Sequence, residues 1–311
     1  MRPLLSFCIR PSSCAFVSRS IAAQTINPRV SNVMSSSSSS GLLCNTRGFH
    51  STTKAASSEG IDILSSFNGK TFIGKDVPKA METLANADAV CFDVDSTVIQ
   101  EEGIDVLADF LGKGPEVSAW TSKAMDGGVK FEDALAARLN IIKPSKNAIE
   151  DCLQKHPLQI SPGIDKLIRE LNSRGTDVYF VSGGFRIMIE PLAKQLMVSK
   201  TNIYANTLQF EDDTEGSYKG FDNSEPTSAD QGKPRALTKI KEEGGYKVMV
   251  MVGDGATDAQ AKPPADAFIG FGGVVERSAV REKACWFVHD FEDMISVVIK
   301  HGQNKLNGGE E

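Results

Sequence analysis

The stretch Ala89-Val90-Cys91-Phe92-Asp93-Val94-Asp95-Ser96-Thr97 decides the fold, because a continuous apolar run ends abruptly in acids. Its first four residues have the length of a strand and do not alternate with polar residues. A continuous apolar run is typical of a strand that is covered on both faces, as in a parallel sheet flanked by helices. The stretch therefore predicts a buried strand that delivers carboxylates to one edge of a sheet.

The same pattern recurs twice further along the chain. Apolar strands are expected at residues 177–181 and 247–252, each preceded by an amphipathic helix, at residues 162–173 and 234–243. Glycines separate each helix from its strand, and a polar loop follows each strand. This order is typical of a doubly wound α/β domain with a mainly parallel sheet.

The remaining segments predict how the chain is divided. A short helix is expected at residues 78–87, and more alternating runs at 203–210 and 217–221 favour a hairpin extension. The stretch between the first strand and the rest of the sheet is rich in helix and lacks such apolar strands. We therefore expect an α/β core (76–101 and 157–303), an inserted helical cap (102–156) and a C-terminal tail (304–311).

Residues 1–58 differ in composition from the rest of the chain. They contain fifteen Ser, five Arg and one Lys but no Asp or Glu, which matches an organellar transit peptide better than an ordinary disordered tail. The short apolar stretches, broken by Arg10 and Pro11, fit a secretory signal less well. The composition leaves mitochondrion and plastid both open, and a retained leader would leave the protein in the cytoplasm.

The charge that follows this leader excludes two classes of partner. The whole chain carries −6 and the leader +6, so residues 59–311 carry −12. Nonspecific nucleic-acid binding and anionic-membrane binding both need a surplus of Lys and Arg. No run approaches the roughly 18 apolar residues of a membrane-spanning helix. Beyond the leader, Cys91, Cys152 and Cys285 form no CxxC pair and are expected to be reduced structural thiols.

Polar side chains follow the three predicted strands and should gather at one edge of the sheet, where ligands bind in open α/β folds. The acids among them are Asp93, Asp95, Asp254 and Asp258. Taken singly, Asp95 or Asp258 is better explained as a helix cap or turn residue. Together, carboxylates so close would repel one another unless a hard divalent cation such as Mg²⁺ were bound. Mg²⁺ keeps phosphate oxygens among its ligands, which points to a phosphate substrate.

These motifs resemble those of the haloacid dehalogenase superfamily of phosphohydrolases. Residues 93–97 look like its DxDx[TV] signature, Ser182 like its second-motif hydroxyl, Lys233 like its lone lysine, and residues 253–258 like its terminal acidic motif. The match is closer to the branch that hydrolyses phosphoserine and extends over residues 80–301. It implies the haloacid dehalogenase-like core with an inserted cap. It also leaves a homodimer open.

The resemblance assigns the chemistry to two acids. Asp93 would be the nucleophile that forms an aspartyl-phosphate, and Asp95 would protonate the leaving hydroxyl and then activate water. Mg²⁺ would be held by the Asp93 carboxylate, the Asp95 main-chain carbonyl and Asp254. Asp258 would complete the outer shell and orient Lys233.

The resemblance also implies the substrate contacts. The phosphoryl group would be held by residues that follow the second and third strands, with the lysine between them: Ser182, Gly183, Gly184, Lys233 and Thr257. Glu102 would pair with the ammonium of phosphoserine and Arg138 with its carboxylate, with Met125 and Phe131 as apolar walls. Asp126 departs from the family pattern, which commonly has Met-Gly-Gly at this position.

The sequence thus predicts a Mg²⁺-dependent enzyme that hydrolyses O-phospho-L-serine to L-serine and phosphate, the last step of L-serine biosynthesis. One alternative keeps the chemistry but changes the acceptor or the substrate, as in a phosphotransferase or another small-molecule phosphatase. A second alternative is a non-catalytic protein that binds a phosphorylated ligand, but such a protein has no need for both a nucleophile and an acid. A Walker-type nucleotide site is excluded because no GxxxxGK[ST] occurs.

Overall fold

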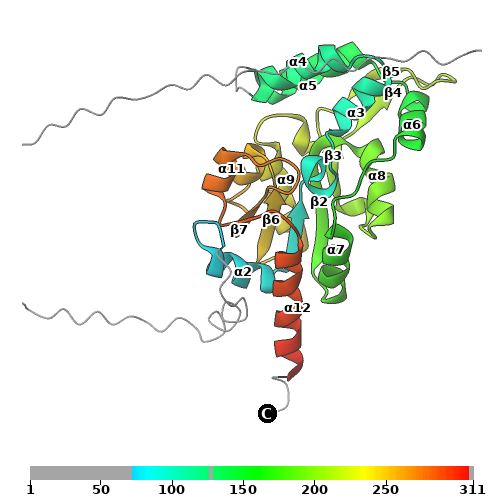
Figure 1. Ribbon diagram of the computed structural model, residues 1–311. Helices are drawn as coiled ribbons and strands as arrows, with labels where there is room; N and C mark the ends of the chain where they lie inside the picture. The colour runs from blue at the N-terminus through cyan, green and yellow to red at the C-terminus, as the bar shows by residue number, and fades with distance from the viewer. Residues whose placement is uncertain (1–71, 126–128, 308–311) are drawn as a thin grey trace, which may run out of the picture. The chain divides into compact units, whose positions relative to one another are not determined.

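The computed structural model describes residues 72–125 and 129–307, which are coloured in Figure 1. The predicted leader and Asp126 lie outside the described residues, as does the side chain of Met125. Within the described part of the chain, no helix is both long and apolar enough to cross a bilayer.

Six parallel strands form the main sheet. Their order across the sheet is β3-β2-β1-β6-β7-β8. The strands are β1 (Ala89–Phe92), β2 (Asp177–Phe185), β3 (Ile203–Asn206), β6 (Met249–Gly253), β7 (Ala267–Phe271) and β8 (Trp286–Val288). The central strand β1 pairs with β2 on one side and with β6 on the other, with Val90 beside Val178 and Val250. Successive strands extend in both directions from β1, which confirms the doubly wound α/β class.

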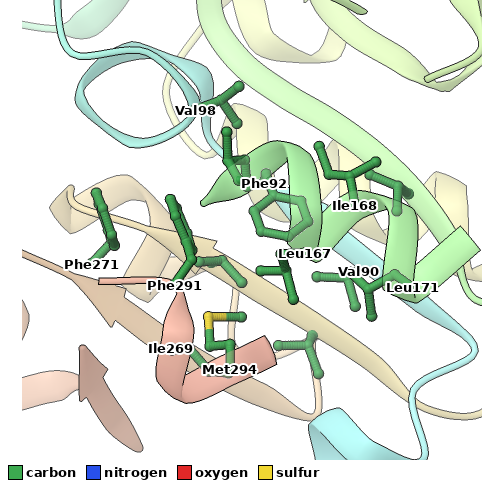
Figure 2. Close-up of a cluster of buried hydrophobic side chains, with 14 of the residues drawn as sticks. Val90, Phe92, Val98, Leu167, Ile168, Leu171, Ile269, Phe271, Phe291 and Met294 are labelled. Carbon is green, nitrogen blue, oxygen red and sulfur yellow. The ribbon is translucent and has the colours of Figure 1, made fainter. Parts of the chain in front are cut away.

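Helices cover both faces of this sheet. One face is covered by α2 (Val77–Ala85), α7 (Ile164–Ser173), α8 (Arg186–Gln195) and α12 (Glu292–Asn307). The other is covered by α9 (Gly232–Gly244), α10 (Ala256–Gln260) and α11 (Ser278–Lys283). Because side chains alternate along a strand, Val90 and Phe92 of β1 enter the first cluster, drawn in Figure 2, while Ala89 and Cys91 enter the second. A strand buried on both sides needs the continuous apolar run seen in the sequence.

The described residues between β1 and α7 include four α-helices. They are α3 (Gly103–Phe110), α4 (Gly114–Met125), α5 (Phe131–Ile142) and α6 (Lys146–Lys155), and we call them the insertion. Their apolar faces, including Leu107 and Leu139, share a third cluster with Phe185 at the end of β2. The domain boundaries at residues 102 and 156 stay a prediction. Cys91, Cys152 and Cys285 are free and buried.

The structure corrects several sequence-based boundaries. Strand β2 continues through Ser182-Gly183-Gly184, which were expected in a loop, because Phe185 still pairs with Asn206 of β3 after a register shift. The predicted hairpin is divided: residues 203–206 join the main sheet as β3, and only β4 (Leu208–Phe210) and β5 (Tyr218–Phe221) form an antiparallel pair. Helix α12 continues to Asn307, past the start of the predicted tail.

Candidate active site

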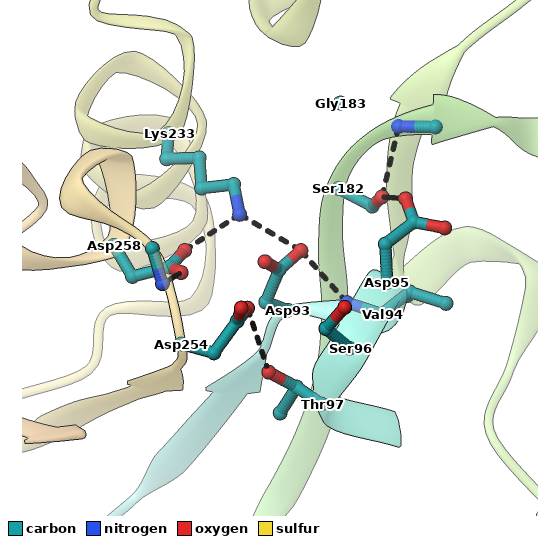
Figure 3. A network of polar contacts seen from close by, with 12 residues as sticks. Asp93, Val94, Asp95, Ser96, Thr97, Ser182, Gly183, Lys233, Asp254 and Asp258 are labelled. Atoms are coloured by element: carbon teal, nitrogen blue, oxygen red, sulfur yellow. Dashed lines mark hydrogen bonds and ion pairs between the residues drawn. The ribbon is translucent and has the colours of Figure 1, made fainter. Parts of the chain in front are cut away.

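Asp93 lies at the carboxyl end of β1, where the chain leaves the sheet in a tight turn. Its Oδ1 accepts a hydrogen bond of 2.8 Å from the N–H of Val94. The turn that follows, η1 (Val94–Val98), contains Ser96 in the left-handed region at φ +53°. The side chains of Asp93 and Asp95 therefore leave the strand end in different directions, as Figure 3 shows.

Lys233 is held between two carboxylates. Its Nζ lies 2.8 Å from Asp93 Oδ1 and 2.6 Å from Asp258 Oδ1 (Figure 3). Burial disfavours the ammonium, but the Asp258 and Asp93 carboxylates outweigh it and raise the pKa of Lys233 above its usual value. Lys233 is therefore a fixed positive charge beside Asp93. It lies in the first turn of α9, not before the helix as the sequence suggested.

Three buried carboxylates form a candidate metal site. Oxygen atoms of Asp93, Asp254 and Asp258 lie within 4.8 Å of one another. Asp254 Oδ1 accepts a hydrogen bond of 3.3 Å from Thr97, whereas its buried Oδ2 accepts none and is paired with the Arg277 guanidinium. Three buried carboxylates that offer oxygens this close together suit a hard divalent cation, which takes oxygen ligands. The residues present therefore fit a metal ion.

Asp258 has a second function in the same cluster. Its Oδ2 accepts the N–H of Gly255 at 2.9 Å, which holds the turn between β6 and α10. Burial and the Asp93 carboxylate raise the pKa of Asp258, although the Lys233 ammonium opposes this. Asp258 Oδ1 and Lys233 Nζ are 2.6 Å apart, and the orienting role expected of Asp258 stays a prediction.

Asp95 points away from this cluster, toward the second strand. Its Oδ1 accepts the N–H of Gly103 at 2.7 Å, and its Oδ2 accepts the hydroxyl of Ser182 at 3.2 Å. Burial, with the nearby carboxylates of Glu102 and Asp93, raises the pKa of Asp95 to about 7. Two carboxyl groups that are two residues apart are thus placed in opposite environments, one beside an ammonium and one in a setting that retains its proton.

The end of β2 approaches Asp95 so closely that a side chain would not fit there. A Cβ atom at Gly184 would lie 2.8 Å from Asp95 Oδ2, and one at Gly183 would lie 2.9 Å from the Phe131 ring. Ser182 is fully buried, and its Oγ accepts the N–H of Gly184 at 2.9 Å. The backbone of Gly183 and Gly184 can therefore approach a ligand next to Asp93 and Asp95.

A cavity of about 470 Å³ joins these groups to the insertion. The insertion and its first connection contribute Glu102, Phe131 and Arg138. Burial lowers the pKa of Arg138, with Asp105 and Glu102 opposing this, and burial raises the pKa of Glu102. Both acidic and basic groups are thus available on this side for a ligand of mixed charge.

The structure brings nearly all the predicted site residues to one cavity. The lining includes Asp93, Asp95, Glu102, Phe131, Arg138, Gly183, Gly184, Lys233, Asp254 and Thr257. Ser182 contacts Asp95 behind this surface. Of Met125 only the backbone is described, at the end of α4.

Sequence reasoning missed Arg277, and it gave no separate role to Thr97, the last residue of the signature at residues 93–97, which bonds to Asp254. Arg277 pairs with Asp254 and lies 3.9 Å from Glu102, so it connects the metal cluster to the insertion side. It follows β7, a strand that the sequence analysis did not predict. The apolar run before it, Ala267–Phe271, was the signal that could have placed another strand end here.

Comparisons with known proteins agree with this geometry. A family model described as haloacid dehalogenase-like hydrolase matches residues 87–263. The chain is 49% identical over 213 residues to "Phosphoserine phosphatase, chloroplastic" of Arabidopsis thaliana, which covers 68% of this chain and 72% of that protein. It is 48% identical over 213 residues to "Phosphoserine phosphatase" of Bos taurus, with 68% and 94% covered.

A solved structure adds evidence on fold and chemistry. The structure described as "Phospho-Aspartyl Intermediate Analogue of Phosphoserine phosphatase" aligns with a TM-score of 0.58 at 28% identity, and covers 67% of this chain and 96% of that one. This chain therefore belongs to the haloacid dehalogenase-like hydrolases. Both relatives named above are phosphoserine phosphatases, so the chain is an enzyme of that branch, and its relatives act on a small-molecule substrate.

Proposed function

We propose that this enzyme hydrolyses O-phospho-L-serine to L-serine and phosphate through an aspartyl-phosphate on Asp93, with Mg²⁺ at the acidic cluster. The observation that carries the proposal is the divergence of Asp93 and Asp95. Asp93 lies 2.8 Å from the Lys233 ammonium, while burial and the neighbouring carboxylates of Glu102 and Asp93 raise the pKa of Asp95 to about 7. One residue is thereby fitted to attack and the other to carry a proton.

In the first step Asp93 attacks phosphorus, and the bond between phosphorus and the serine oxygen breaks. Asp95 gives its proton to that oxygen as serine leaves. In the second step Asp95, now ionised, takes a proton from water as the water oxygen attacks phosphorus. The bond between phosphorus and the Asp93 oxygen breaks, which releases phosphate and restores the Asp93 carboxylate. The pKa of about 7 suits both directions of this transfer near neutral pH.

The phosphoryl group needs positive charge and N–H donors on its equatorial oxygens. Lys233 and the Gly183 N–H are fitted to supply them, with Gly184 and Thr257 close by on the cavity lining, and the Ser182 hydroxyl would join them by turning away from Asp95. Mg²⁺, when bound by Asp93, Asp254 and the Asp95 carbonyl, would neutralise charge on the phosphoryl oxygens. In that arrangement Asp258 holds Lys233 in place.

The groups beyond the phosphate select the substrate. Phosphoserine carries a carboxylate, which the planar guanidinium of Arg138 can bind in a bidentate manner, and an ammonium, which Glu102 can pair with. Glu102 is held by a 2.9 Å hydrogen bond from Ser96, in the turn that carries Asp95. The residue that would recognise the substrate ammonium is therefore hydrogen-bonded to the turn that carries the catalytic acid.

The destination of the chain is part of the same proposal. We infer that residues 1–58 direct the enzyme to an organelle, on the basis of their Ser-rich and acid-free composition and of the chloroplastic plant relative. Expression of residues 1–58 fused to a fluorescent protein tests this inference. Diffuse cytoplasmic fluorescence would contradict it.

Phosphate release from L-phosphoserine, with and without Mg²⁺, is the direct test. Phosphothreonine, phosphoethanolamine and sugar phosphates serve as competing substrates in the same screen. Adding alcohols such as homoserine, and analysing the products, separates hydrolysis from phosphotransfer. Hydrolysis that favours another phosphate ester over L-phosphoserine would overturn the substrate assignment, and turnover by Asp93→Asn at the unaltered rate would overturn the mechanism.

A further inference from the structure

Two neighbouring residues at the first turn of α5 contact the sheet side of the cavity. Glu132 Oε2 accepts a hydrogen bond of 3.1 Å from the backbone N–H of Asp230. The ring of Phe131 lies so close to Gly183 that a Cβ atom there would be 2.9 Å from it. The first turn of α5 therefore contacts the sheet side at two points. One is Gly183, next to Ser182, and the other is Asp230, three residues before Lys233.

The segment that receives Glu132 is fixed from its other side. It lies between η3 (Pro226–Ser228) and α9. The guanidinium of Arg235, one turn into α9, donates to the carbonyls of Asp230 at 2.6 Å, Pro226 at 2.8 Å and Ala229 at 3.4 Å. The carbonyls of this segment are thus held by α9, whereas the N–H of Asp230 is bonded to the insertion.

The two groups that α5 contacts, Gly183 and Asp230, are linked to each other by hydrogen bonds, and we call this linked set the platform. Asn206, which is fully buried at the end of β3, donates from Nδ2 to the Gly183 carbonyl at 2.7 Å. Its Oδ1 accepts the hydroxyl of Thr227 at 3.2 Å. The Gly183 contact and the Asp230 contact are therefore joined through Asn206 and η3, and α5 docks on a surface that does not depend on it.

The position of this platform connects docking to the chemistry. Residues 229–231 line the cavity and lead directly to Lys233, which lies in the first turn of α9. Phe131 and Arg138, about two turns apart on α5, line the same cavity. A movement of the first turn of α5 away from the platform would separate the amino-acid side of the cavity from its phosphate side.

We propose that Glu132 is a positioning residue whose bond to the Asp230 N–H latches α5 over the bound substrate. The expected effect on KM for L-phosphoserine rests on the proposed function, whereas the expected effect on hydrogen exchange of the Asp230 amide does not. The latch is a single hydrogen bond to a half-buried carboxylate, so it can break and reform. The apparent affinity for substrate then depends on the fraction of molecules in which the latch is made.

The contact carries charge as well as geometry. The N–H groups of Glu132 itself and of Asp230 lower the pKa of Glu132, so the carboxylate is ionised at neutral pH. The nearby Lys130 and Arg235 act in the same direction. The neighbouring acid Asp133 lies in the same first turn and is exposed, and it provides a matched control.

The test compares Glu132→Ala, Glu132→Gln and the control Asp133→Ala in the full chain. Hydrogen exchange of peptides that cover residues 226–235 is measured without ligand, together with KM and kcat for L-phosphoserine in Mg²⁺. For Glu132→Ala we expect faster exchange of the Asp230 amide and a KM raised about threefold to tenfold, with kcat changed by less than about twofold. Glu132→Gln keeps an acceptor oxygen and should show a smaller rise, and Asp133→Ala none.

Several results would overturn the latch. Exchange and KM of Glu132→Ala equal to those of the unaltered chain would do so, and so would the same changes in Asp133→Ala. If Glu132→Ala lowered both the thermal midpoint and kcat but left KM unchanged, the role of Glu132 would be merely structural. If the unaltered chain released no phosphate from L-phosphoserine, the proposed function would fail, while the exchange comparison would still decide whether Glu132 holds the Asp230 amide.

Discussion

The sheet side and the insertion side of the cavity hold their charges in different ways. On the sheet side, Asp93, Lys233 and Asp258 are almost completely buried and bonded to one another at 2.6 to 2.8 Å. On the insertion side, the Glu102 side chain is 34% exposed and Arg138 bonds within its own helix, to Ala134. Buried charges tolerate desolvation only when they are paired.

The difference indicates a division of labour. The phosphoryl-transfer groups are assembled before substrate arrives, and their mutual bonds fix their directions. The groups that recognise the amino-acid end retain free donor capacity, because one bond uses only one of the five N–H donors of the Arg138 guanidinium. Changes on the sheet side should therefore affect the chemical step, and changes on the insertion side should affect selection.

Removing the nucleophile should have the largest effect. Asp93→Asn keeps the size of the side chain but cannot form the acyl-phosphate, so we expect phosphate release to fall by about a thousandfold or more. Hydroxylamine trapping of the acyl-phosphate should fail in the same variant. The exposed acid Asp151 provides the control, because Asp151→Asn should keep full turnover. Turnover by Asp93→Asn within tenfold of the unaltered chain would break the comparison.

Chelation tests whether the sheet side needs a cation to balance its carboxylates. Activity should be lost in EDTA and return with Mg²⁺. Independently of activity, Mg²⁺ at about a hundred times its Kd should stabilise the fold by about 2.7 kcal/mol, seen as a higher thermal midpoint. Asp254→Asn should lose most of this rise. A midpoint that does not respond to Mg²⁺ would place the metal elsewhere.

The insertion side is tested by Arg138→Lys, which keeps the charge and removes the planar fork. We expect kcat/KM for L-phosphoserine to fall by about tenfold to a hundredfold, mainly through KM. The rate with phosphoethanolamine, which lacks the carboxylate, should change much less. Equal losses for both substrates would mean that Arg138 does not select the carboxylate.

The pH profile of the first step should report the environment of Asp95. Its pKa is raised to about 7, so the carboxyl is protonated below that value and loses its proton as the pH rises through it. A general acid acts only when protonated, so single-turnover formation of the acyl-phosphate should slow by about tenfold between pH 6 and pH 8. Asp95→Asn should be slow at all pH values, and a profile of the unaltered chain that rises over this range would contradict the assignment.

Much of this organisation could be predicted from the sequence, for identifiable reasons. Residues 89–93 combine a run buried on both faces with a carboxylate at its end. This one stretch therefore predicts the strand, the parallel sheet and the edge of the sheet at which the site lies. The Asp76 cap of α2 and the Gly245 end of α9, at φ +65°, carry local signals of the same kind. Such signals depend only on neighbours along the chain.

What could not be predicted depends on contacts between distant segments. That Ser182 and Gly184 remain in β2 is decided by pairing with Asn206 and by the close approach of Asp95. Arg277 reaches Asp254 from a loop 23 residues away, and Glu132 reaches Asp230 across 98 residues. An isolated arginine or glutamate in a sequence gives no sign of such a partner.

The short segment before α2 has a consequence for association between molecules. The carbonyl of Ile73 accepts the N–H of Phe287 at 2.7 Å, and Lys75 and Asp76 donate to the carbonyls of Ala284 and Cys285 at 3.1 and 3.0 Å. Residues 73–76 therefore occupy the outer edge of β8, the last strand of the sheet. A chain shortened to begin at Val77 would leave these donors and acceptors bare, and bare strand edges invite edge-to-edge aggregation. Residues 73–76, directly before α2, thus cover this strand edge and keep the sheet of one molecule from being extended by the sheet of another.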